Sequence, residues 1–148
     1  MIVMLENEAE TAALGGRIAD ALLPGDAVLL SGELGAGKTA LARAILRARG
    51  VAEHVPSPTF TLVQAYDTPS LQVRHFDLYR IEREIDLNEL GVEDALEDGA
   101  IIVEWPERAP ARFPHEALRI DLRATGETSR EARLSGPERW RNIVAKVS

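Results

Sequence analysis

Hydrophobic residues follow two patterns along this chain, a helical repeat and short apolar runs. Apolar side chains recur every three or four residues over residues 8–23, which predicts an amphipathic helix. A second helix is expected over residues 38–49, because alanines and leucines there precede Gly50. A third is expected over residues 137–147, since Pro137 suits a first helical turn.

The remaining hydrophobic segments are short and predict strands. They cover residues 27–31, 61–66, 71–77, 100–104, 118–123 and 131–135. Turn-forming residues 67–70 predict a hairpin between the second and third of these strands. Residues 82–98 predict short helical pieces broken at Gly91. Strands interleaved with helices are typical of the α/β class.

Composition narrows the class of protein. A length of 148 residues suits one domain spanning residues 1–148. The formal net charge of -7 argues against DNA or RNA bound by bulk charge and favours a protein partner. The chain has no cysteine, no signal-peptide pattern and no apolar stretch approaching the roughly 20 residues of a membrane span. We therefore expect a cytoplasmic protein that does not enter a membrane.

The clearest motif is a phosphate-binding loop. Residues 32–39 read Gly-Glu-Leu-Gly-Ala-Gly-Lys-Thr, which matches G-x-x-x-x-G-K-[ST] in full. The loop lies between a predicted strand and a predicted helix, as a P-loop does. Backbone N–H groups can approach phosphates closely at glycine, Lys38 is expected to reach the β- and γ-phosphates, and Thr39 to ligate Mg²⁺. This predicts an ATP and Mg²⁺ site in a P-loop NTPase-like three-layer sandwich with a mixed, mainly parallel central sheet.

Two acidic residues end predicted strands and are candidates for ordering the metal. Asp77 ends residues 71–77, and Glu104 ends residues 100–104. A carboxylate in this position lies at the carboxyl edge of the sheet, where ligands bind in open α/β folds. The alternative is that each is simply an exposed acidic residue at the end of a strand. His75 alternates with Phe76 on the predicted strand and is interpreted as structural.

The segment over residues 55–61 contains two prolines and follows the predicted P-loop helix. In nucleotide switches a threonine in such a loop senses the γ-phosphate and Mg²⁺. The candidates are Ser57, Thr59 and Thr61. A rigid proline turn is an equally good interpretation of this segment.

Four motifs in order make the chain resemble the bacterial TsaE family, small ATPases required for threonylcarbamoyladenosine (t6A) modification of tRNA. They are the P-loop, Ser-Pro-Thr-Phe-Thr-Leu-Val over residues 57–63, His-Phe-Asp-Leu-Tyr-Arg over 75–80 and Val-Glu-Trp-Pro-Glu over 103–107. The chain departs from the commonest family pattern at Glu33, where aspartate is frequent, and at Ala40, where threonine is frequent.

The resemblance implies a Mg²⁺-dependent ATPase with Lys38, Asp77 and Glu104 as catalytic residues. It implies that Thr39, Glu104 and Asp77 surround the metal. Nucleotide-binding residues implied by the resemblance are Glu33, Leu34, Gly35, Ala36, Gly37, Lys38, Thr39 and Ala40, with Glu8 and Arg133 as additional candidates. The implied partners are TsaD and TsaB, with tRNA contacted indirectly through their complex.

Two other functions are compatible with a P-loop. A small-molecule kinase needs a second substrate pocket and usually an arginine-bearing lid, and arginines lie at positions 119, 123, 130 and 133. A nucleotide-gated binding module needs no turnover at all. The chain has no Asn-Lys-x-Asp motif for reading guanine, which favours ATP over GTP.

Overall fold

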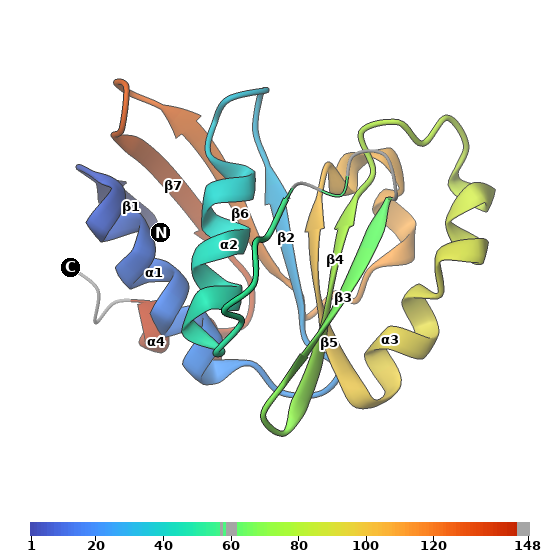
Figure 1. Cartoon of the computed structure of the whole chain (residues 1–148). Coiled ribbons are helices and arrows are strands. Elements are labelled where there is room, and N and C mark those ends of the chain that lie inside the picture. The colour runs from blue at the N-terminus through green and yellow to red at the C-terminus, as the bar shows by residue number, and fades with distance from the viewer. Residues whose placement is uncertain (57, 59–61, 145–148) are drawn as a thin grey trace.

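The structure, a computed structural model, describes residues 1–56, 58 and 62–144. A seven-stranded sheet runs through its centre (Figure 1). The strands are β1 (Ile2–Leu5), β2 (Ala27–Ser31), β3 (Val63–Thr68), β4 (Leu71–Asp77), β5 (Gly99–Glu104), β6 (Leu118–Ala124) and β7 (Arg130–Ser135). The helices are α1 (Glu8–Ala21), α2 (Lys38–Ala48), α3 (Val92–Asp98) and α4 (Glu138–Val144), with short 3₁₀ segments at Glu84–Leu90, Pro106–Arg108 and Pro110–Arg112.

The strand order is β1-β7-β6-β2-β5-β4-β3. Its four central strands, β6, β2, β5 and β4, are parallel to one another. The outer pairs β1–β7, β6–β7 and β3–β4 are antiparallel. This confirms the predicted mixed, mainly parallel central sheet, and it brings the carboxyl ends of β2, β4 and β5 to one edge.

Side chains alternate between the two faces of the sheet and pack into two hydrophobic cores. On one face, Val28 and Ile120 pack in a core with side chains of α1, α2 and α4, among them Trp140. On the other face, Leu29 and Phe76 pack with residues of α3, of the Glu84–Leu90 segment and of the stretch 105–117. Helices therefore cover the sheet on both sides, which confirms the predicted three layers (Figure 1).

Most predicted elements are present, with ends shifted by a few residues. The strand predicted over residues 61–66 lies at Val63–Thr68, since Thr68 pairs with Leu71 across a two-residue connection. The final helix is described to Val144, and the rest of its predicted range lies outside the described residues. Strand β1 was not predicted, because four residues carry little periodicity and its partner β7 lies at the other end of the chain.

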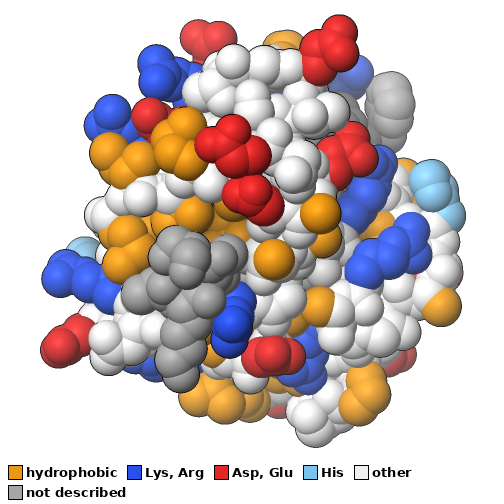
Figure 2. All heavy atoms as spheres, turned by 90° about the vertical axis from the view of Figure 1, so that its left-hand side faces the viewer, with side chains coloured by type: hydrophobic (Ala, Val, Ile, Leu, Met, Phe, Trp, Pro, Cys, Tyr) orange, Lys and Arg blue, Asp and Glu red, His pale blue; other side chains and the backbone are white. Residues whose placement is uncertain are grey.

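Charge is not gathered on the side of the molecule that carries α1 and β1. Figure 2 shows acidic, basic and hydrophobic side chains interspersed there. No helix among the described residues has both the length and the apolar composition needed to cross a bilayer.

Candidate functional site

The loop between β2 and α2 has a backbone that requires glycine at two points. Gly32 has φ +141°, and a Cβ there would lie 2.4 Å from the carbonyl oxygen of Leu122. Gly37 has φ +102° and precedes α2 without any side-chain cap. The first N–H groups of α2 therefore have no side-chain acceptor, and the helix dipole adds positive potential at this point. Such a helix N-terminus is an anion-binding site.

Lys38 is the first residue of α2, and its side chain reaches back to this loop. Its side chain is buried, and Nζ donates hydrogen bonds to the carbonyl oxygens of Gly32 and, at 2.8 Å, Glu33. Nζ also lies 4.2 Å from the ring centroid of Trp105. Burial lowers the pKa of Lys38, and the carboxylates of Glu104, Glu107, Asp77 and Asp121 oppose that shift.

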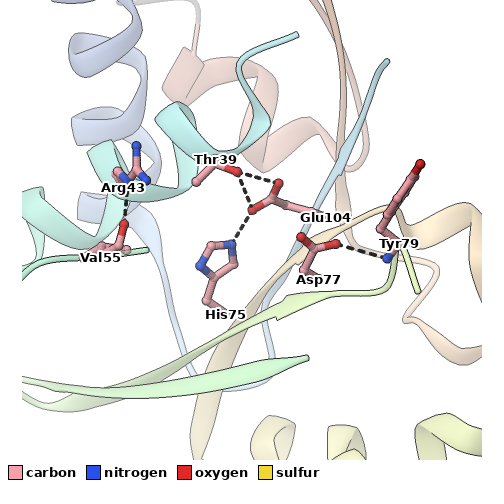
Figure 3. A network of polar contacts seen from close by, with 7 residues as sticks. All are labelled: Thr39, Arg43, Val55, His75, Asp77, Tyr79 and Glu104. Carbon is pink, nitrogen blue, oxygen red and sulfur yellow. Dashed lines mark hydrogen bonds and ion pairs between the residues drawn. The ribbon is translucent and has the colours of Figure 1, made fainter. Parts of the chain in front are cut away.

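A buried chain of polar contacts joins α2, β5 and β4 beside the loop (Figure 3). The Thr39 hydroxyl lies 2.8 Å from Oε1 and 3.1 Å from Oε2 of Glu104, and donates to that carboxylate. Oε2 of Glu104 is also 2.6 Å from Nε2 of His75. Glu104 is only 2% exposed and His75 is fully buried. A charged carboxylate is rarely buried so completely unless polar partners hold it.

Asp77 lies next to Glu104, as the strand pattern predicts. The two residues are paired in the parallel register of β4 and β5, and Asp77 is 4% exposed. Its Oδ1 accepts a hydrogen bond from the backbone N–H of Tyr79 at 3.0 Å. Both acids are therefore buried at the carboxyl edge of the sheet rather than exposed strand ends. No group of three histidine, cysteine or acidic side chains with metal-ligand geometry occurs in the described part of the chain.

Two adjoining cavities share Gly37 and Ala40. The first, the carboxylate-side cavity, has a volume of about 340 Å³. Its lining consists of Leu34, Gly35, Gly37, Lys38, Thr39, Ala40, Asp77, Tyr79, Glu104 and Trp105. The second, the α1-side cavity, has a volume of about 320 Å³. It is lined by Glu8, Thr11, Ala12, Gly37, Ala40, Arg43, Ala44, Leu122, Glu127, Thr128 and Arg130.

The structure brings most of the predicted site residues to these cavities. Glu8 lies at the α1-side cavity, directly after the helix cap Asn7. Within the loop, Ala36 is buried and Leu34 is 71% exposed. Glu33 lines neither cavity but a separate hollow beside Asp121 and Arg123. Ser57, Thr59 and Thr61 lie outside the described residues.

Arg133 lines neither cavity but a separate hollow beside Arg119 and Asp121. It hydrogen-bonds Glu131 at 3.2 Å and lowers the pKa of that carboxyl group. Arg130, three residues earlier, has the opposite orientation because side chains alternate along a strand. Its guanidinium donates to the carbonyl oxygens of Ser129 and Gly35, and it lines the α1-side cavity. Of these two arginines of β7, Arg130 lines this cavity, as Arg43 of α2 does, and Arg133 does not.

The sequence pattern does not indicate His75 and Arg43 as residues of this region. It favours a structural role for His75, although this residue shares a strand face with Asp77 two residues later. Nε of Arg43 donates to the carbonyl oxygen of Val55, which ties α2 to the segment leading to residue 57 (Figure 3). The sequence signal for Arg43 is its position one helical turn after Thr39, which places both side chains on the same face of the helix.

Comparisons with known proteins agree on one family. The family model described as threonylcarbamoyl adenosine biosynthesis protein TsaE matches residues 5–132. The TsaE protein of Rickettsia typhi is 43% identical over 85% of this chain and 88% of that protein. The corresponding protein of Streptomyces coelicolor is 40% identical over 90% of this chain and 96% of its own length.

A solved structure has a similar fold. The crystal structure of Bacillus subtilis YdiB superposes with a TM-score of 0.79 at 26% sequence identity, over 99% of this chain and 93% of that one. The loop, the paired carboxylates and the strand order thus occur in a chain that matches one family over most of its length. The protein belongs to the TsaE family.

Proposed function

We propose that this protein is the ATP-binding and ATP-hydrolysing component of the machinery that makes N6-threonylcarbamoyladenosine in tRNA. The observation that carries the proposal is the convergence of Lys38, Thr39, Glu104 and Asp77 on one cavity beside the glycine-rich loop. The names of the related TsaE proteins indicate the pathway, tRNA threonylcarbamoyladenosine biosynthesis.

The residues of the carboxylate-side cavity fit Mg²⁺. Thr39, Glu104 and Asp77 present hydroxyl and carboxylate oxygens, the hard donors that this ion prefers. Three such protein donors do not fill an octahedral shell, which suits an ion that is also held by nucleotide phosphates. When bound, Mg²⁺ would neutralise charge that develops on the transferred phosphoryl group.

Lys38 and the start of α2 would hold the phosphates. The carbonyl oxygens of Gly32 and Glu33 keep the ammonium inside the loop, next to the uncapped N–H groups of α2. Phosphate oxygens offer it stronger hydrogen bonds, because donor and acceptor are then both charged. We expect Lys38 to exchange its carbonyl contacts for the β- and γ-phosphates.

The α1-side cavity would receive the adenosine. It adjoins the loop through Gly37 and Ala40, and its wall includes the turn between β6 and β7. Arg130 fastens that turn to the loop through the carbonyl oxygens of Ser129 and Gly35. Glu8 and Thr11 of α1 lie in the cavity lining and offer polar groups to a base or ribose.

Efficient turnover would require a partner. Fast phosphoryl transfer often needs an arginine near the γ-phosphate, and no arginine of the described chain lines the carboxylate-side cavity. Leu34 and Tyr79 in that lining have exposed hydrophobic side chains. We propose that the TsaD–TsaB complex binds here and contacts these two side chains. None of the arginines at positions 119, 123, 130 and 133 lines this cavity, which also disfavours the kinase alternative.

The test is phosphate release from ATP and Mg²⁺ by the pure protein, then with TsaB and TsaD added. We expect slow release alone and a rate at least tenfold higher in the complex. Lys38→Ala is the control and should remove the signal, because charged contacts of this kind contribute about 1.5–3 kcal/mol, or roughly ten- to a hundredfold in affinity. A phosphorylated small molecule would indicate a kinase, and binding without any turnover would indicate a switch.

A further inference from the structure

We infer that His75 is a positioning residue that holds the carboxylate of Glu104 in the orientation needed to order Mg²⁺. The inference rests on the proposed function for the metal, and it assigns a role to a side chain that does not line either cavity.

In Figure 3 the Thr39 hydroxyl and the imidazole of His75 approach the carboxylate of Glu104 from different directions. Nε2 of His75 and the Thr39 hydroxyl both contact the carboxylate, and they come from different elements, β4 and α2. The parallel pairing of β4 with β5 brings the two strands together at this point and sets His75 opposite Ile102. The carboxylate is therefore held by two groups that share contact with Oε2, one from the central sheet and one from helix α2.

The proton on the ring follows from hydrogen-bonding chemistry. An ionised carboxylate only accepts hydrogen bonds, so Nε2 must carry the proton that joins it to Oε2 of Glu104. Nδ1 is buried and has no hydrogen-bond partner among the described residues. The contact with Glu104 is thus the one hydrogen bond that the described structure gives this fully buried ring.

A purely structural role explains this position poorly. Burying a polar group with one of its two nitrogens unsatisfied costs free energy, and an apolar side chain would fill the same core space without that cost. Groups that hydrogen-bond a metal-ordering residue fix its orientation, and their loss typically lowers metal affinity about 10- to 100-fold. A role in orienting the carboxylate of Glu104 accounts for the burial of this ring.

The experiment measures ADP affinity by calorimetry on the full chain, once with Mg²⁺ and once with EDTA. The quantity of interest is the ratio of the two dissociation constants. His75→Leu removes the donor, His75→Gln keeps an N–H donor, and Val73→Ala is a matched control that opens the same buried face of β4 two residues away. Thermal unfolding is recorded for each variant.

We expect His75→Leu to reduce the Mg²⁺-dependent ratio about tenfold while the affinity in EDTA stays within about twofold. His75→Gln should recover most of the ratio. Val73→Ala should lower the melting temperature and keep the wild-type ratio. A wild-type ratio in His75→Leu, an equal loss in Val73→Ala, or no recovery in His75→Gln would each overturn the inference.

Two further measurements keep the outcome decisive. Absence of any Mg²⁺ effect in the wild-type protein would overturn the proposed metal site itself, and the inference with it, before any variant is compared. If the variants do not fold, long-range ¹H–¹⁵N spectra of the wild-type imidazole decide the matter. A proton on Nε2 supports the inference, and a ring protonated only on Nδ1 overturns it.

Discussion

The ammonium of Lys38 lies 4.2 Å from the centre of the Trp105 ring, in a position to interact with its π face. The ring of Tyr79 lies 4.9 Å from that of Trp105, so the lysine, the tryptophan and the tyrosine form one contiguous group. Trp105 itself has a left-handed backbone with φ +61° directly after Glu104. Any displacement of Lys38 toward phosphates changes the charge next to this indole.

ATP should therefore change the fluorescence of Trp105. The chain has two tryptophans, and Trp140→Phe leaves Trp105 as the remaining one. Titration of this variant with ATP and Mg²⁺ should give a saturable change in emission. The same titration in a variant that also carries Lys38→Met should give at most a small change, because the cation is gone. An unchanged spectrum during nucleotide binding detected by calorimetry would contradict the prediction.

Lys38 should lose its proton at a lower pH than an ordinary lysine in the nucleotide-free protein. Burial lowers its pKa from the usual 10.5, so the native state binds fewer protons than the unfolded state between the two pKa values. The contribution of this residue to the free energy of unfolding therefore rises with pH across that interval. Competitive acetylation followed by mass spectrometry gives the pH midpoint of Lys38 directly.

Two controls accompany the acetylation experiment. Denatured protein should return the midpoint of Lys38 to the ordinary value. ATP with Mg²⁺ should shift the midpoint upward, because phosphate charge favours the ammonium form. A native midpoint at or above that of the denatured protein would show that the surrounding carboxylates outweigh burial.

Removing a strand-end carboxylate should damage hydrolysis more than nucleotide binding. Glu104 and Asp77 lie side by side at the edge of the sheet, where they can order the metal and its waters. We expect Glu104→Gln and Asp77→Asn to lower phosphate release in the full complex about 100-fold or more, with ATP affinity in EDTA changed less than about threefold. If a variant retains the normal rate of phosphate release, the residue that it replaces has no catalytic role.

Arg130 and Arg133 offer a matched pair on opposite faces of β7. Arg130→Ala should weaken ATP binding about tenfold, because Arg130 joins the wall of the α1-side cavity to the loop. Arg133→Ala should leave affinity within about twofold, since its described hydrogen bond goes to Glu131. Calorimetry with ATP compares the two directly, and the reverse order of effects would favour Arg133 as the nucleotide contact.

Local signals were sufficient for much of the fold. The hydrophobic repeats located α1 and α2 because each helix covers a core with one stripe of side chains. The continuous apolar runs located β2 and β5 because both strands are buried on both faces. Strand β1 was missed, since its stability comes from pairing with β7 and not from any periodicity of its own.

The sequence by itself determined the loop, its lysine and its threonine, because the spacing of glycines and the residues beside them is a local property of the chain. It also placed Asp77 and Glu104 at strand ends. Only the tertiary structure decided that His75 reaches Glu104 and that Arg130 rather than Arg133 meets the loop. Those contacts depend on strand order, register and side-chain direction, which arise when segments far apart in the chain pair and pack.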